Sequence, residues 1–360
     1  MKRFNTIDSK ELEAAEVAVL DAAYDGDSPL SGYIASEVIG GPSCRKLEQE
    51  WTKIFGIKHA MAINSGTSGL LAACMAIDIC HGSEVIVSSY TMSATAAVPK
   101  ILGAKIVFAD IEKDTFTIDP VDVSNLITSR TEAVIATNLF GHPANLHELR
   151  DICDNHGIYL IEDNAQAIFA KEYDKYTGTI GHIGVFSLNV HKHLQVGEGG
   201  IVVTNQGYLD KKIREAMNHG EMRGGIPGLN LRMTEVTAAM AIEQLKKAPQ
   251  IMASRKHIAE MITGCVSRFP IAAPMTRQGC EHSYYCWAGL LDDIPGELPA
   301  PFKRGYVHPL YDMPAFRQNP SISLPIVEEI ERKIVLVELC SIDPTDDEIT
   351  KMVEELGKCL

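Results

Sequence analysis

The chain has 360 residues, of which 46% are hydrophobic and 22% are charged. This composition is typical of a globular protein, and the length favours two domains over one small core. The formal net charge of −14 at pH 7 argues against a sequence-independent nucleic-acid binder, because such a protein needs a basic surface to neutralise phosphates. A local pocket for a single phosphate is compatible with this charge.

The sequence predicts a cytoplasmic protein without a membrane or nucleic-acid partner and without a resident metal. No stretch approaches the length of apolar residues that spans a bilayer, and the amino terminus has no apolar signal segment. The nine cysteines are scattered, with no CxxC pair. Cys74 and Cys80 share an apolar stretch, which suits buried free thiols better than a disulfide frame or a zinc site.

Short apolar runs alternate with helical patterns from about residue 45 to residue 205. Most runs are continuous in Val, Ile and Ala, as in strands covered on both faces. We expect strands at His59–Asn64, Glu84–Ser88, Lys105–Asp110, Ala133–Asn138, Tyr159–Asp163, Val185–Leu188 and Ile201–Thr204, and helices at Ser68–Ile79, Ser93–Leu102 and Asn145–His156. The alternation predicts an α/β fold with a mostly parallel central sheet flanked by helices.

The pattern changes after an Ala- and Met-rich helix that we expect at Met233–Leu245, where Pro249 follows. The final segment, Asp343–Leu360, reads as an acidic amphipathic helix that begins after Asp343-Pro344-Thr345. We therefore assign residues 1–245 to an amino-terminal segment and a large domain, and residues 246–360 to a smaller α+β domain.

The segment Asn64–Gly69 closes a predicted strand and opens a predicted helix. Gly66 and Gly69 allow a sharp turn, and a helix amino terminus offers free N–H groups to an anion, beside the hydroxyls of Thr67 and Ser68. A plain strand–helix turn with a Ser or Thr N-cap explains the same residues. The motif alone therefore leaves phosphate binding as one of two interpretations.

Asp163 ends the most apolar strand candidate, and Lys192 follows on a loop before the turn Gly197–Gly200. Ligands of open α/β sheets bind at the carboxyl ends of strands. A carboxylate there can pair with a cationic ring nitrogen, and a lysine amine can form a Schiff base with an aldehyde. A helix N-cap and a surface lysine are the ordinary alternatives. Phosphate turn, aspartate and lysine in this order favour pyridoxal-phosphate (PLP) chemistry.

Three further residues lie close to Lys192 in the sequence. Ser187 precedes it by five residues and is a second candidate phosphate donor. His191 and His193 flank it, but two histidines at i and i+2 without a nearby Cys or Asp are a weak metal ligand set. We expect both histidines to line a pocket or to pack.

The chain resembles the DegT/DnrJ/EryC1/StrS family of PLP-dependent sugar aminotransferases, which have the fold type I of aspartate aminotransferase. The resemblance runs from about Gly40 to Leu245, and beyond it the similarity is loose apart from elements such as His308-Pro309. The matching motifs are Gly41-Pro42 with Leu47-Glu48, Asn64 through Ser68, Glu84 through Val87, Ser89-Tyr90-Thr91, Gly141-His142-Pro143, Ile161 through Gln166, Ser187 through Lys192, Gly197 through Gly200, and Asn230 through Glu235.

The resemblance implies a role for each matching position. Lys192 is the Schiff-base lysine and the general acid and base, and Asp163 pairs with the ring nitrogen. Gln166 lies near the phenolic oxygen of the cofactor, and Asn230 reaches the phosphate of the neighbouring subunit, so that a homodimer shares its active sites. The residues implied to hold the phosphate within the chain are Gly66, Thr67 and Ser187.

Two positions depart from the family pattern. The family usually stacks an aromatic residue on the cofactor ring after the Tyr-Thr pair, where this chain has Met92. A thioether covers a ring by dispersion but without the same offset stacking, and Tyr90 is not a safe substitute. His191 stands where many relatives have Asn or another polar residue. A subgroup that deoxygenates sugars replaces the lysine itself with histidine, so Lys192 favours transamination.

The resemblance therefore implies an aminotransferase that moves an amino group from glutamate or glutamine to a nucleotide-linked keto-sugar by a ping-pong reaction. The alternatives are a PLP-dependent sugar dehydratase, an aminotransferase for a cyclitol or a small phosphorylated ketone, and a regulatory or scaffold protein that keeps only the fold. Arg232 is a candidate contact for a carboxylate or a phosphate, although an arginine near a helix start is often structural. His308 and Arg223 are weaker candidates for the acceptor pocket.

Overall fold

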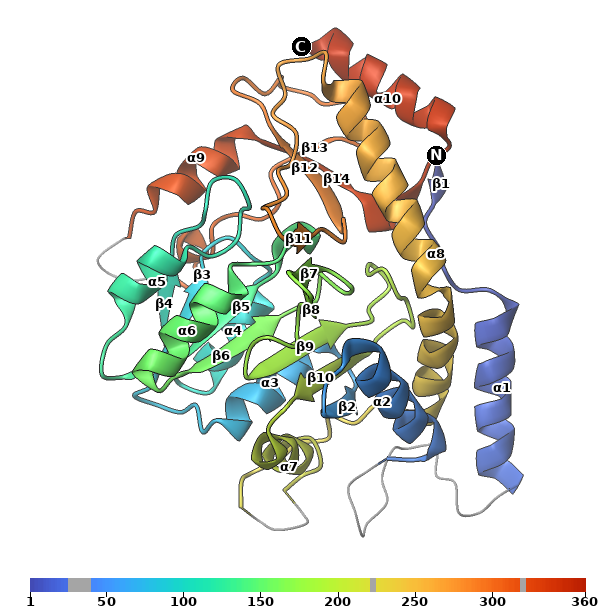
Figure 1. Cartoon of the computed structure of the whole chain (residues 1–360), viewed down its shortest axis with the longest axis vertical. Coiled ribbons are helices and arrows are strands. Elements are labelled where there is room, and N and C mark those ends of the chain that lie inside the picture. Colours follow the sequence, from blue (N-terminus) through green and yellow to red (C-terminus); the bar gives the residue numbers. More distant parts are fainter. Residues whose placement is uncertain (25–39, 221–224, 318–321) are drawn as a thin grey trace.

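A seven-stranded sheet forms the centre of the computed structural model, which describes residues 1–24, 40–220, 225–317 and 322–360 (Figure 1). The strand order is β2-β10-β9-β6-β5-β3-β4. The strands are β2 (His59–Ile63), β3 (Glu84–Ser88), β4 (Lys105–Ala109), β5 (Thr131–Thr137), β6 (Tyr159–Asp163), β9 (Ile183–Ser187) and β10 (Gly200–Thr204). Of these seven, β10 runs antiparallel to both of its neighbours, and the other pairings are parallel. The predicted mostly parallel sheet is confirmed.

Helices cover both faces of this sheet. One face packs against α3 (Gly66–Ala76), α4 (Ala94–Ile101) and α7 (Gly207–Ala216), and the other against α5 (Pro120–Leu126), α6 (Leu146–His156), α2 (Pro42–Phe55) and the first half of α8 (Glu235–Val266). The alternation along β3 shows why its apolar run is continuous. Val85 and Val87 join the core under α3 and α4, whereas Ile86 joins the core under α5 and α6. A strand buried on both faces needs no polar positions.

The helix expected to end at Leu245 continues, as α8, through Pro249 to Val266. That expected end is wrong, because a proline ends a helix only when nothing compensates for the lost hydrogen bond. Here α8 packs along α1 (Ser9–Tyr24), α2 and α10 (Asp346–Cys359). Ala248 and Ile251, on either side of the proline, are both buried. The division of the chain at residue 245 falls inside this helix and stays a prediction.

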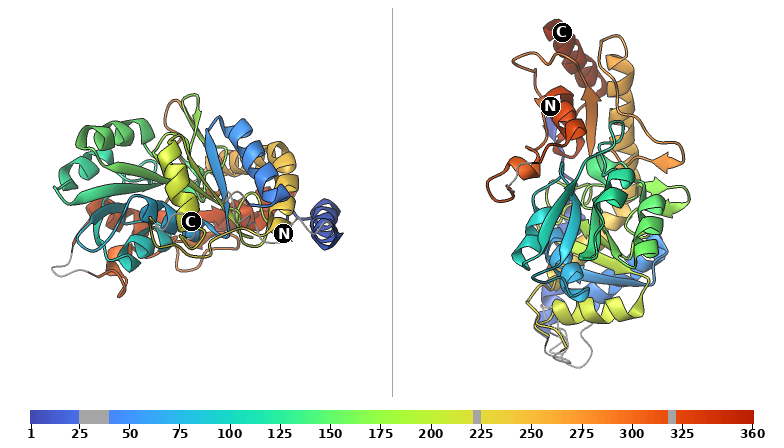
Figure 2. Two further views of the ribbon diagram at one scale, coloured as in Figure 1. Left: turned by 90° about the horizontal axis from the view of Figure 1, so that it is seen from below. Right: turned by 90° about the vertical axis from the view of Figure 1, so that its left-hand side faces the viewer.

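The carboxyl-terminal part forms a smaller antiparallel sheet in the order β12-β14-β13. This sheet lies beside the carboxyl-terminal half of α8 (Figures 1 and 2). The remaining elements are β1 (Lys2–Arg3), β7 (Lys171–Glu172), β8 (Lys175–Tyr176), β11 (Cys280–Glu281), β12 (Cys286–Leu290), β13 (Lys303–Arg304), α9 (Pro325–Lys333), β14 (Ile334–Glu338) and β15 (Ile342–Asp343). One face of β14 packs Val335 and Val337 against α8 and α10. A capping box formed by Thr345 and Glu348 begins α10. Thr345 is the last residue of the predicted start signal.

All nine cysteines are free thiols. Cys74 is buried in α3, as expected, but Cys80 is exposed, so the expectation of a buried thiol at Cys80 is wrong. Cys80 lies in the turn after α3, and turns run over the surface because their backbone groups need water. Within the described parts of the chain, no helix has the length and apolar character needed to cross a membrane.

Candidate active site

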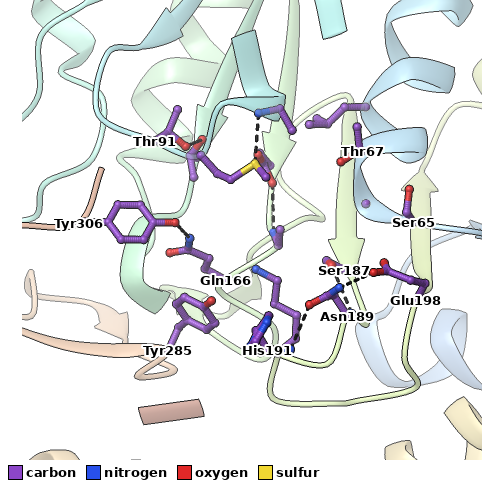
Figure 3. Close-up of a pocket in the computed structure, with 18 of the residues that line it drawn as sticks. Ser65, Thr67, Thr91, Gln166, Ser187, Asn189, His191, Glu198, Tyr285 and Tyr306 are labelled. Carbon is purple, nitrogen blue, oxygen red and sulfur yellow. Dashed lines mark hydrogen bonds between the residues drawn. The ribbon is translucent and has the colours of Figure 1, made fainter. Parts of the chain in front are cut away.

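A cavity of about 460 Å³ opens at the carboxyl edge of the central sheet (Figure 3). Thr137 ends β5, Asp163 ends β6 and Ser187 ends β9, and all three line the cavity. The carboxyl ends of parallel strands meet at one edge of a sheet, which is where ligands of open α/β folds bind. The strand order therefore gathers residues that are far apart in the sequence.

One end of the cavity is formed by the amino terminus of α3 and by Ser187. The Ser65 hydroxyl accepts a hydrogen bond from the Ser68 N–H at 3.1 Å, so the N-cap interpretation of this motif is correct for Ser65. Gly66 and Thr67 occupy the first positions of the helix and line the cavity. Their N–H groups have no carbonyl partner within the helix, and such groups bind anions. A Cβ on Gly66 would lie 3.1 Å from the Cβ of Ser187, so the helix end and β9 approach closely.

The carboxylate of Asp163 is almost fully buried, at 5% exposure. Its Oδ2 accepts the Thr95 hydroxyl at 2.8 Å, and its Oδ1 accepts the Ala165 N–H at 3.2 Å. Burial raises the pKa of Asp163, and these hydrogen bonds together with the charge of Lys192 oppose the rise. No helix follows Asp163, because residues 164–170 form turns, so the helix N-cap alternative does not apply.

Lys192 lies on the loop between β9 and β10. Its N–H donates to the Asn189 carbonyl at 2.9 Å, and its own carbonyl accepts from the Gln195 side chain at 3.2 Å. The Nζ atom lies 4.7 Å from the centre of the Tyr285 ring. Burial lowers the pKa of this amine, and the negative charge of Asp163 acts in the opposite direction. A lysine with a lowered pKa in a cavity is a functional candidate, unlike a surface lysine.

The two histidines beside Lys192 have different roles. His191 is exposed and lines the cavity. His193 is buried, and its Nε2 lies 2.9 Å from the Ser283 carbonyl oxygen. Burial lowers the pKa of His193 to about 4, so it is a neutral packing residue that ties the Lys192 loop to the segment before β12.

The side chain of Gln166 connects the loop after β6 with the carboxyl-terminal part of the chain. Its Nε2 donates to the Tyr306 hydroxyl at 2.7 Å, and its Oε1 accepts the Phe140 N–H at 2.9 Å. Tyr306 and Tyr285 lie on one side of the cavity, opposite Ser65 and Thr67 (Figure 3). Both tyrosines come from the carboxyl-terminal part, where the only residue proposed from the sequence for the site was His308.

Other lining residues were also missed from the sequence. Thr91 follows β3, Asn189 and Glu198 come from the Lys192 loop, and Glu338 and Ser341 come from the end of β14 and the turn after it. The Asn189 side chain donates to Glu198 at 2.7 Å. These polar residues have no local signature, because only the fold brings them to one cavity.

Met92 lines the cavity and is 50% exposed. Its sulfur accepts the Ala94 N–H at 3.1 Å, which holds the side chain at the start of α4. Tyr90, by contrast, is fully buried, and its hydroxyl accepts the Tyr306 N–H at 3.2 Å. Met92, not Tyr90, is therefore the residue in a position to cover a ligand.

Three expected residues, among those that the structure describes, do not line the cavity of their own chain. Asn230 is exposed and forms an isolated bridge with Asn218. Arg232 donates to the side chain of Asn218. His308 is exposed and its Nδ1 lies 2.9 Å from a Glu331 oxygen. Arg223 lies outside the described residues.

The fold and the site together define a fold type I aminotransferase, with a lysine and an aspartate facing one cavity at the carboxyl edge of the sheet. A sequence profile of the DegT/DnrJ/EryC1/StrS aminotransferase family matches residues 33–356. The chain belongs to this family of aminotransferases.

Individual relatives agree with the family. The chain is 33% identical to the GDP-perosamine synthase of Vibrio cholerae over 274 residues, which cover 75% of this chain and 74% of that one. The structure of an aminotransferase from Psychrobacter cryohalolentis matches 99% of this chain and 98% of its own, with a TM-score of 0.88 and 26% identity. DesI, solved in the presence of its TDP-sugar product, matches 99% of this chain and 91% of its own, also with a TM-score of 0.88 and 26% identity.

Proposed function

We propose that this protein is a PLP-dependent aminotransferase that moves an amino group from glutamate or glutamine to a nucleotide-linked keto-sugar by a ping-pong reaction. The observation that carries the proposal is the meeting of Asp163, Lys192 and the amino end of α3 in one cavity. Each of these three features is common in proteins when it occurs alone. Their occurrence in one cavity is uncommon.

The cavity residues fit the chemical groups of PLP. The α3 N–H groups, with the hydroxyls of Thr67 and Ser187, suit a phosphate. Asp163 suits a cationic ring nitrogen, and the Lys192 amine suits an aldehyde. When bound, PLP supplies an aldehyde that takes up the amino group and a ring that accepts electron density from the reacting carbon.

The two ionisable residues Lys192 and Asp163 then have separate tasks. Because burial lowers its pKa, the Lys192 amine would be suited to take the proton from the α-carbon of the amino donor and to deliver it to C4′, the aldehyde carbon of the cofactor. The Asp163 carboxylate keeps the ring nitrogen positively charged. Asp163 is withdrawn from water, which strengthens this ionic contact.

The opposite wall of the cavity suits a polyhydroxylated acceptor. Tyr285, Tyr306, Glu338 and Ser341 place hydroxyl and carboxylate groups there, and such groups can hydrogen-bond to sugar hydroxyls. The relatives that are named for a GDP-linked product or solved with a TDP-sugar support a nucleotide-linked acceptor for this chain as well.

The proposal includes a homodimer with shared active sites. Among the described residues that line the cavity, Lys192 is the sole lysine or arginine. A bound PLP phosphate and the carboxylate of the amino donor carry several negative charges, which favours further donors from a second copy. Asn230 is exposed and outside its own cavity, which is compatible with a contact to the neighbouring phosphate.

Two experiments test the proposal. The wild-type protein with PLP should show the absorbance of a lysine-linked cofactor, lost on adding glutamate, and K192A should lose both that absorbance and turnover. Normal turnover by K192A would refute the assignment. A panel of nucleotide-linked keto-sugars, cyclitol ketones and small phosphorylated ketones is then tested with glutamate as the donor and 2-oxoglutarate as the measured product, which should form with a nucleotide sugar. Consumption of the sugar without 2-oxoglutarate would instead indicate a dehydratase.

A further inference from the structure

A buried threonine stands directly behind Asp163. Thr95 belongs to the first turn of α4, is fully buried, and donates its hydroxyl hydrogen to Asp163 Oδ2 at 2.8 Å. It does not appear among the residues that line the cavity. A ligand that contacts Asp163 from the cavity therefore leaves the Thr95 contact in place.

The direction of this hydrogen bond follows from the carboxylate, which only accepts, and the neighbouring hydroxyls are compatible with it. The Thr91 hydroxyl donates to Thr137 Oγ1 at 2.9 Å, and its oxygen lies 3.4 Å from that of Thr95. Each hydroxyl has one hydrogen, and an ionised carboxylate only accepts. With the Thr91 hydrogen on Thr137, the Thr95 hydrogen is directed to Asp163, and the two bonds form without competition.

We propose that Thr95 is a positioning residue, which holds the Asp163 carboxylate in one orientation and in its ionised form for the ring nitrogen of PLP. The inference rests on the proposed function, because it needs PLP bound with Asp163 as the partner of the ring. Thr95 acts through Asp163 and does not touch the reacting atoms.

The other contacts of Asp163 show why this hydrogen bond matters. Burial disfavours the charged carboxylate, and three interactions oppose that effect: the Thr95 hydroxyl, the Ala165 N–H and the charge of Lys192. The Ala165 bond, at 3.2 Å, is the longer of the two hydrogen bonds. Lys192 becomes engaged with the cofactor and its substrates during the reaction. The hydrogen bond from Thr95 is thus the shorter of the two that Asp163 accepts, and it stays in place throughout the reaction.

The test compares PLP dissociation constants of the apo-proteins. Valine has nearly the shape of threonine without the hydroxyl, so T95V should bind PLP about tenfold to a hundredfold more weakly, as expected for loss of a hydrogen bond to a charged group. T95S keeps the hydroxyl and should stay near wild type. T204V is the matched control, because Thr204 is a buried threonine whose hydroxyl donates to the His182 carbonyl at 2.8 Å, at the opposite edge of the sheet.

A double-mutant cycle separates positioning from general stability. If Thr95 acts through Asp163, T95V should change the PLP affinity of D163N by less than threefold. An equal loss in both backgrounds, or wild-type affinity in T95V, would overturn the inference. If T95V does not fold, as judged by circular dichroism, T95A takes its place in the same cycle. Absence of PLP binding by the wild-type protein would refute the proposed function itself, so the two failures are distinguishable.

Discussion

Replacement of glycine by alanine should change the free energy of unfolding in opposite directions at two helical positions, Gly69 and Gly264, because only Gly69 is packed closely against the sheet. Gly69 lies in α3, and a Cβ built on it would come within 2.6 Å of Val185 Cγ1 and 3.1 Å of Val202 Cγ2. Gly264 lies in α8, and a Cβ there would meet nothing within 4 Å. The change from glycine to alanine in a helix interior is intrinsically favourable by about 1 kcal/mol. At Gly264 this gain is unopposed.

At Gly69 the gain is offset by overpacking, which costs about 1–3 kcal/mol in a tightly packed core. We therefore expect G264A to unfold at a higher urea concentration than wild type and G69A at a lower one, with unfolding free energies about 1–3 kcal/mol apart. The measurement is urea unfolding of the apo-proteins followed by circular dichroism. Stabilisation of G69A equal to that of G264A would refute the close packing of α3 on the sheet.

The substitution G69A should also affect the binding of PLP. Gly69 follows the residues at the amino end of α3, so a helix pushed away from β9 moves its N–H groups relative to Ser187. We expect G69A to bind PLP more weakly, while G264A, which is remote in the fold, keeps wild-type affinity. Wild-type PLP affinity in a destabilised G69A would show that α3 yields elsewhere and that its amino end stays fixed.

Four further predictions concern the residues of the site. D163N should lower kcat by on the order of a hundredfold to a thousandfold, because removing one member of a buried ion pair costs about 3–5 kcal/mol; activity within threefold of wild type would contradict this. Burial raises the pKa of Asp163 in the folded apo-protein. The contribution of Asp163 to the free energy of unfolding is therefore fully present below the pKa that Asp163 has in the unfolded chain, and it is lost as the pH rises through the pKa that Asp163 has in the folded protein. Apo-D163N should therefore exceed apo-wild type in urea midpoint at pH 8, and the gap should shrink on acidification. Mixing K192A with N230A protomers should restore activity, up to about a quarter of wild type, since half of randomly mixed dimers carry one intact shared site; no recovery under conditions of subunit exchange would argue against sharing. M92F should tighten PLP binding several-fold by offset stacking, worth about 0.5–1.5 kcal/mol, and weaker binding in a titration would show that Met92 does not cover the ring.

Much of the central sheet could be predicted because its signals are local. The middle of a strand covered by helices on both faces is apolar on both faces, so a run such as Val85, Ile86 and Val87 stands out without knowledge of its neighbours. The helix start at Thr345 is encoded by two residues three positions apart, whose capping box satisfies the free N–H groups of the first turn. The end of α8 could not be predicted in this way, because Pro249 is tolerated through packing with α1 and α2.

The sequence by itself determined the order of the Asn64–Gly69 turn, Asp163 and Lys192, and this order favours one class of chemistry. The turn and Asp163 each close a recognisable apolar run, and Lys192 lies on the loop after the next such run. Only the tertiary structure decided which residues surround them. Thr95 reaches Asp163 across 68 residues, and Tyr306 reaches Gln166 across 140. Such contacts depend on strand order and on the packing of the carboxyl-terminal part over the sheet edge, and neither leaves a local pattern in the chain. The side of the cavity that carries Tyr285 and Tyr306 is built from contacts of this long-range kind.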